Sequence, residues 1–218
     1  MPRILQLADD FAERFAFERT RVAGYVKALR EAGRIKTGPH GVNAPNATTM
    51  DAARILIAMM LRPKLHEVAE SVELFGKFKI IATDGKENEY PAHCEDALAK
   101  ALEFYGNKAA QGDTSRFFTF RIHFDHAFAT MTVSVWAGDD DPRLEDESFS
   151  GFDEVELRYL HPEFAPSLEN GAELTPALRA AWRRYRSGFH EVPMLDSHDL
   201  AEIGQVIAGH IPPKRPEK

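Results

Sequence analysis

Two short groups of side chains in this sequence have the composition of a reactive site. His123, Asp125 and His126 offer two imidazoles and a carboxylate, which are common metal ligands. They fall at a predicted hairpin turn, where the imidazoles need not share a face, and the spacing indicates no third ligand. His93 and Cys94 stand together at the start of a predicted helix, where we expect a buried or half-buried thiol with a packing role. We therefore predict no metal site and no cofactor.

The remaining sequence carries none of the common catalytic motifs. The acidic stretch from Asp139 to Glu147 lacks the ligand and glycine spacing of a calcium-binding loop. The chain has no phosphate-binding P-loop, no dinucleotide glycine fingerprint, no G-x-S-x-G elbow and no H-E-x-x-H pair. We accordingly predict that the protein is not an enzyme and has no catalytic residues.

Basic side chains gather in the first part of the chain. Residues 1–66 hold 11 lysines and arginines against 6 aspartates and glutamates, a net charge of +5. The remainder holds 16 against 28, a net charge of −12. A basic segment joined to an acidic body is the distribution expected when one end of a protein meets phosphate groups. Seven of these cations crowd one stretch: Arg14, Arg19, Arg21, Lys27, Arg30, Arg34 and Lys36.

An amphipathic helix over residues 22–32 is predicted to position these cations. At about 100° per residue, Val22, Val26 and Leu29 form one stripe that should be buried. The opposite face carries Thr20, Gly24, Lys27 and Glu31, with Arg19 and Arg21 near its N-terminal end. Glycine inside a helix is unfavourable, so Gly24 indicates a close approach to another surface. Gly33 ends the helix as a left-handed cap, and Ile35 returns to the core.

The residues after this helix predict a short hairpin that displays polar side chains. Gly38 and Gly41 supply its turns, and Lys36, Thr37 and His40 lie on its surface. We expect the cations to contact phosphate, so that affinity falls steeply with salt. Base edges would be read from the helix, by Arg19, Thr20, Arg21, Gly24 and Lys27.

This order of elements resembles the winged helix-turn-helix superfamily. Its members commonly show V-x-x-x-L-x-x-L-x-x-x-G-x-I followed by x-x-G-x-x-G, and here the matching positions are Val22, Val26, Leu29, Gly33, Ile35, Gly38 and Gly41. The preceding helix, residues 4–15, carries Leu7-Ala8-Asp9, which is similar to the opening of the family's first motif helix. The connection from Leu7 to Val22 is about four residues longer than in compact members. The resemblance covers residues 4–60 and implies DNA binding. On this interpretation, the helix face, the hairpin and the charges predict these DNA-binding residues: Arg19, Thr20, Arg21, Gly24, Lys27, Arg30, Lys36, Thr37 and His40.

The rest of the chain predicts an α+β body. Alternating apolar residues over 116–124 and 127–136 indicate an antiparallel hairpin, which a strand over 154–160 extends. Helices are predicted over 51–61 with a Thr48 cap, over 65–78, 91–105 and 175–187, and after a cap at Asp196 or Ser197. An edge strand is predicted over 189–195. The helices 51–61 and 65–78 have two interpretations, a dimer seam or an internal core.

The full fold prediction is α+β, with an N-terminal winged helix-turn-helix module in residues 1–64. An α+β dimerisation or sensing body with a short antiparallel sheet follows in 65–211, and 212–218 form a disordered tail. No signal-peptide layout and no apolar run of membrane-spanning length are present, and a single cysteine suits the cytoplasm.

The predicted function is sequence-specific binding of double-stranded DNA by a homodimeric transcriptional regulator, bacterial or from a phage, with no membrane partner and with an unknown effector. Two alternatives remain open. One is a DNA-binding accessory, packaging or replication adaptor of a phage or mobile element, for which a ring assembly would be characteristic. The other is an enzyme with its site in residues 79–210, for which a pocket of converging His, Asp or Glu would be characteristic.

Overall fold

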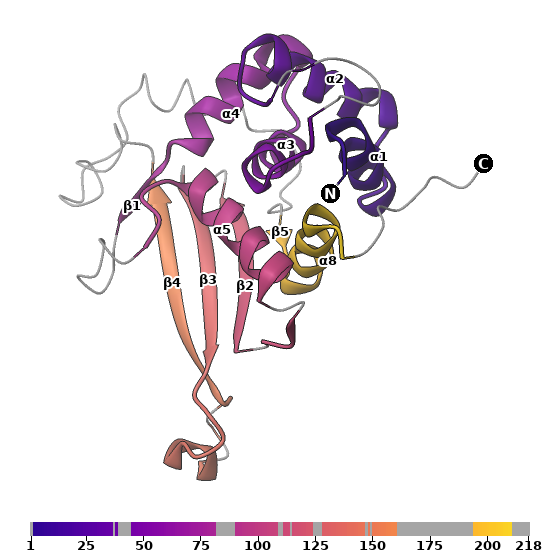
Figure 1. Cartoon of the computed structure of the whole chain (residues 1–218). Helices are drawn as coiled ribbons and strands as arrows, with labels where there is room; N and C mark the ends of the chain where they lie inside the picture. The colour runs from indigo at the N-terminus through magenta and orange to yellow at the C-terminus, as the bar shows by residue number, and fades with distance from the viewer. Residues whose placement is uncertain are drawn as a thin grey trace, which may run out of the picture.

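The described chain combines α-helices with an antiparallel sheet, so the fold is α+β as predicted (Figure 1). The computed structural model describes residues 2–36, 38, 45–81, 90–108, 111–113, 115–123, 128–146, 148, 150–160 and 194–210. The first helices gather at one end of the molecule, and three long strands extend away from them. The predicted hairpin residues Thr37 and His40, the turn residues Asp125 and His126, the helix 175–187 and the tail 212–218 lie outside the described residues.

The N-terminal part is built from four α-helices. They are α1 (Ile4–Arg14), α2 (Arg19–Glu31), α3 (Thr49–Leu61) and α4 (Val68–Gly76), and the 3-10 turn η2 (Leu65–Glu67) leads into α4. The predicted cap of α3 is confirmed. Thr48 Oγ1 accepts a hydrogen bond from the Asp51 amide at 3.2 Å, and Asp51 Oδ2 accepts one from the Thr48 amide at 2.9 Å. This reciprocal pair satisfies amide groups that a helix start leaves without partners.

Helix α3 lies in the interior of the helical layer. From Asp51 to Leu61 every residue is buried except the half-buried Arg54, and α1, α2, α4 and α5 all contact the helix. A helix that is apolar on all sides must be covered on all sides. Of the two interpretations offered for this segment, the internal core is therefore right, and a dimer seam along α3 is wrong.

The sheet has five antiparallel strands in the order β1-β4-β3-β2-β5. The strands are β1 (Lys79–Ile81), β2 (Arg116–His123), β3 (Phe128–Trp136), β4 (Phe152–Leu160) and β5 (Met194–Leu195). The predicted hairpin and third strand are thus confirmed, and Met131 of β3 lies between Phe120 of β2 and Leu157 of β4. All three of these side chains are buried. The alternation of apolar residues correctly identified the covered face.

Two helices cover that face of the sheet, α5 (Cys94–Asn107) and α8 (Ser197–Ala208) (Figure 1). The Asp196 carboxylate accepts the Asp199 amide hydrogen bond at 2.9 Å, which confirms the predicted cap of α8. Phe118 of β2 packs edge-on against Phe104 and Tyr105 of α5. The 3-10 turn η5 (Pro142–Glu145) lies at the far end of the sheet, away from the N-terminal helices.

One cluster of buried side chains runs from Ile4 in α1 to Ile207 in α8. It includes residues of α2 and α3 together with residues of α5 and the sheet, so it crosses the predicted boundary between residues 64 and 65. The division into a DNA-binding module and a separate body stays a prediction. Among the described helices, none combines the length and the hydropathy that crossing a membrane requires.

Candidate nucleic-acid interface

Helix α2 has one fully buried side and one exposed side. The predicted stripe of Val22, Val26 and Leu29 is confirmed, since none of these side chains is more than 1% exposed. Tyr25 joins the stripe and is also buried. Gly33 has φ +67°, and the Arg34 amide donates to the Leu29 carbonyl at 2.8 Å, so the predicted left-handed cap is confirmed. The interior of the protein therefore fixes both the position and the rotation of this helix.

The exposed side of α2 carries Thr20, Ala23, Lys27 and Glu31 in one line along the helix. The Lys27 side chain is 77% exposed and forms an ion pair with Glu31 at 3.8 Å. An exposed pair of this kind contributes little to stability. Lys27 is consequently available to a ligand at small cost to the fold.

Arg19 and Thr20, at the start of α2, have carboxylate partners within the chain. An Arg19 Nη atom lies 2.8 Å from Asp9 of α1, and the Thr20 hydroxyl donates to Glu18. Both Arg19 and Asp9 are substantially exposed. A phosphate or a base edge that binds these donors must compete with the protein's own acidic groups.

Arg21 lies against the connection between α3 and α4. Its Nε donates to the Tyr25 hydroxyl at 2.7 Å, and its Nη2 donates to the Arg62 carbonyl at 3.2 Å. Its guanidinium also lies 5.7 Å from the centroid of the Tyr25 ring, within cation–π distance. These contacts hold the charge of Arg21 at one flank of the exposed line.

Gly24 lies at a close approach, as predicted, but the approaching group belongs to the same chain. A Cβ atom at Gly24 would lie 2.8 Å from Cδ2 of Leu65 in η2, and Gly24 is half-buried. The predicted contact of Gly24 with DNA stays a prediction, but the close approach at Gly24 does not support it. The missing side chain makes room for Leu65, and Gly24 is left out of the contact set proposed below.

The remaining predicted contact residues lie toward the other end of α2. Arg30 is half-buried in the last turn. Lys36 is exposed beyond the helix, and its backbone amide donates to Asp51 at the start of α3 at 3.1 Å. Because 13 helical residues span about 18 Å, Lys36 is well separated from Arg19. The structure thus brings together Arg19, Thr20, Arg21 and Lys27, but not Lys36.

Arg14 and Arg34 do not belong to the predicted contact surface. The Arg14 side chain is only 5% exposed and forms ion pairs with the buried Asp10 and with Glu202 of α8. Arg34 forms an ion pair with Glu73 of α4. Their charges are matched by carboxylates inside the protein, so the basic excess of residues 1–66 overstates the charge offered to a partner. Sequence position alone could not show that the acidic partners are distant in the chain.

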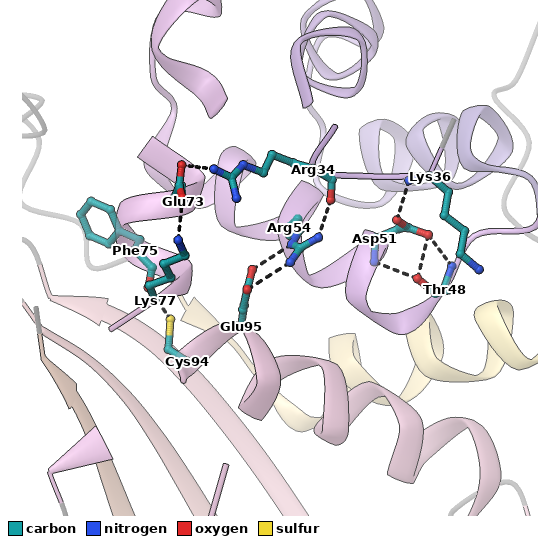
Figure 2. Close-up of polar contacts among 10 residues, drawn as sticks. All are labelled: Arg34, Lys36, Thr48, Asp51, Arg54, Glu73, Phe75, Lys77, Cys94 and Glu95. Carbon is teal, nitrogen blue, oxygen red and sulfur yellow. Dashed lines mark hydrogen bonds and ion pairs between the residues drawn. The ribbon is translucent and has the colours of Figure 1, made fainter. Parts of the chain in front are cut away.

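A polar network fixes the C-terminal end of α2 (Figure 2). Arg54 of α3 donates through Nε and Nη2 to the two carboxylate oxygens of Glu95 in α5, at 2.8 and 3.1 Å, and through Nη1 to the Arg34 carbonyl. The hydrogen bond with Glu95 raises the pKa of Arg54 above its ordinary value. Hydrogen bonds from Lys77 and Arg34 lower the pKa of Glu73. Four helices are joined at this point.

Cys94 is buried beside the same network, as predicted. Its Sγ lies 2.7 Å from the Phe75 carbonyl, to which the thiol donates. Burial raises the pKa of this thiol well above its ordinary value, which disfavours the reactive thiolate. Within the described ranges, no three His, Cys, Asp or Glu side chains converge in a way that could hold a metal ion.

Two cations near the start of α2 were missed in the sequence. Arg62 and Lys64 are exposed on either side of Pro63, directly after α3. The Arg62 guanidinium lies 4.9 Å from the ring centroid of Phe17, in the turn between α1 and α2. The sequence signal was present, because a basic Arg-Pro-Lys segment follows a helix that must be buried. No family model, no curated protein and no solved structure matches this chain.

Proposed function

We propose that this protein binds double-stranded DNA in a sequence-specific manner through the N-terminal half of α2, as a winged helix-turn-helix protein. The observation that supports this most is the two-sided character of α2. One side is anchored by buried Val22, Val26 and Leu29, while the line through Thr20, Ala23 and Lys27 is exposed. A helix that enters the major groove needs such a rigid support and such a free face.

The charges along α2 favour its N-terminal half as the contact region. Arg19 and Arg21 lie in the first turn of α2 and Lys27 lies just past its middle, whereas the C-terminal end presents Glu31 and, on neighbouring α4, Glu73. In helix-turn-helix proteins, N-terminal residues of the recognition helix contact base edges. Thr20 and Lys27 are the proposed base-reading residues, and Arg19 and Arg21 are proposed to position the helix through phosphate or guanine contacts.

The proposed biological role is transcriptional regulation by a cytoplasmic homodimer. Two copies reading two half-sites about one helical turn apart gain affinity that a single small module seldom reaches. Helix α3 cannot supply the contact between the copies because it is buried within one chain. The proposal therefore places dimerisation on other surfaces of the described chain or on the residues outside it.

Selection from a pool of random duplexes, followed by fluorescence anisotropy at near-physiological salt, tests this proposal. The full-length protein should enrich a defined sequence. Lys27→Ala should weaken binding to that sequence between about fivefold and about a hundredfold, the range expected for one specific contact. The matched control is Lys100→Ala, which removes an exposed lysine from α5. The proposal is wrong if no sequence is enriched and no duplex binds, or if the two variants bind equally well.

A further inference from the structure

The connection between α3 and α4, residues 62–66, is held against α2 by three contacts from one flank of that helix. Arg21 Nη2 donates to the Arg62 carbonyl at 3.2 Å, and the Tyr25 hydroxyl donates to the Pro63 carbonyl at 3.4 Å. Leu65 packs over Gly24. These contacts, together with the restricted backbone of Pro63, fix the connection beside the N-terminal half of α2.

The connection presents positive charge next to the exposed line of α2. Arg62 and Lys64 are both exposed, and the His66 side chain is 75% exposed. The acidic Glu67 lies 3.6 Å from His66. The Arg62 guanidinium is supported by the ring of Phe17, so its charge is held above the turn between α1 and α2.

The placement of this charge relative to α2 decides what it can contact. At about 100° per residue, Arg21 and Gly24 lie on one side of the exposed line, and Arg30 lies on the other. An α-helix with its side chains is about 10–12 Å across and the major groove is about 12 Å wide, so a helix in the groove has a phosphate backbone along each flank. The 62–66 connection occupies one of these flanks.

We propose that Arg62 and Lys64 form a phosphate-binding element that contacts the DNA backbone beside α2. This inference rests on the proposed function and adds a second contact element to it. Contacts to phosphate position the recognition helix without reading sequence. The two residues should therefore contribute equally to specific and to nonspecific binding, and their contribution should depend on salt because each contact releases counterions.

The test compares Arg62→Gln/Lys64→Gln with the control Lys100→Gln/Lys108→Gln, which removes two exposed charges, one from α5 and one from the residue that follows it. Glutamine keeps part of each side-chain stem and removes only the charge. Binding of the full-length proteins to the selected duplex and to a random duplex is measured between 50 and 300 mM salt. This range includes physiological ionic strength, where the Debye length is about 8 Å. Arg62→Gln/Lys64→Gln should lose on the order of tenfold in affinity on both duplexes. The magnitude of the slope of log K against log salt should fall by about 2.

Several outcomes separate this inference from the proposed function. If the wild type and the first variant bind with the same affinity and slope while Lys27→Ala weakens binding, the phosphate element is wrong and the proposed function stands. If affinity falls on the selected duplex alone, the connection reads bases, and the backbone role is wrong. If the wild type binds no duplex, both proposals fail. Should the double variant melt early, Lys64→Gln alone decides: the slope should fall by about 1, and an unchanged slope overturns the inference.

Discussion

Gly106 of α5 and Gly204 of α8 lie against each other where these two helices pack together. A Cβ atom at Gly106 would lie 2.8 Å from the Gly204 carbonyl oxygen, and one at Gly204 would lie 2.5 Å from the Leu102 carbonyl oxygen. Both glycines are buried. The two helix backbones therefore approach more closely than any side chain would allow, and this contact fixes the α5–α8 pair that covers the sheet.

Gly204→Ala should destabilise the protein by about 1–3 kcal/mol. The atoms that the new methyl group would meet belong to the backbone of α5, so they can move only if the whole helix moves. Urea unfolding measures the effect as a lower midpoint with an unchanged m-value. A variant as stable as the wild type would show that α5 and α8 can separate freely.

Gly24→Ala should not destabilise the protein, although its Cβ atom would lie 2.8 Å from Leu65 Cδ2, nearly as close as the 2.5 Å contact at Gly204. The new Cβ would meet the end of the Leu65 side chain, which is 53% exposed and can rotate away. Alanine also favours a helix interior over glycine by about 1 kcal/mol. Urea unfolding should therefore show a stability that is unchanged or raised by up to about 1 kcal/mol. A clear loss of stability would mean that Leu65 is confined.

Sequence patterns predicted those features that depend on neighbouring residues. The Thr48–Asp51 cap, the Asp196 cap, the Gly33 helix end and the alternation along β2 and β3 all arise within a few residues. Each is determined by local backbone geometry or by the two-residue period of a strand. Such signals gave the α+β fold class and most element positions.

The partners of the N-terminal cations could not be predicted in this way. Arg14 pairs with Glu202 of the last described helix, and Arg54 pairs with Glu95 of α5. Nothing near Arg14 or Arg54 in the sequence indicates which distant carboxylate it meets. The close approach at Gly24 was foreseen, but nothing near Gly24 in the sequence indicates that Leu65 is the neighbouring group.

The carboxylate of Asp141 should titrate at an unusually low pH. Arg143 donates to it through Nε and Nη2 at 3.0 and 2.7 Å, and these hydrogen bonds lower the pKa of Asp141 from 3.8 to about 2. Because the folded-state pKa is lowered, any stabilisation from this group is complete above pH 3.8 and is lost as pH falls through about 2.

Arg143→Gln should raise the pKa of Asp141 back toward its ordinary value, which NMR titration of the carboxyl carbon can measure. The return should be partial, since the backbone amide of residue 143 still donates to Asp141 at 2.9 Å. Asp113 serves as the control, because hydrogen bonds from Ser115, and not from Arg143, are the main cause of its lowered pKa. An Asp141 pKa that is the same in both proteins would show that the Arg143 side chain does not hold this carboxylate in solution.

Arg54 of α3 links the residue Arg34, which follows α2, to Glu95 of α5, and we expect this link to stabilise the fold. Its side chain is 24% exposed and that of Glu95 is 15% exposed, so both charges are largely removed from water. Arg54→Ala leaves the Glu95 carboxylate and the Arg34 carbonyl without this donor. We expect a loss of about 1–3 kcal/mol in urea unfolding, the usual cost of an unsatisfied group that is mostly buried.

Two further variants distinguish the network from the loss of a single charge. Arg54→Lys should recover only part of the stability, because an ammonium group cannot donate to both Glu95 oxygens in the planar arrangement of a guanidinium. Lys77→Ala removes an exposed partner of Glu73 and should cost less than about 1 kcal/mol. If Arg54→Ala costs no more than Lys77→Ala, the network does not anchor α2. If it does anchor α2, hydrogen exchange in Arg54→Ala should also accelerate at the Arg34 amide, which closes the end of that helix.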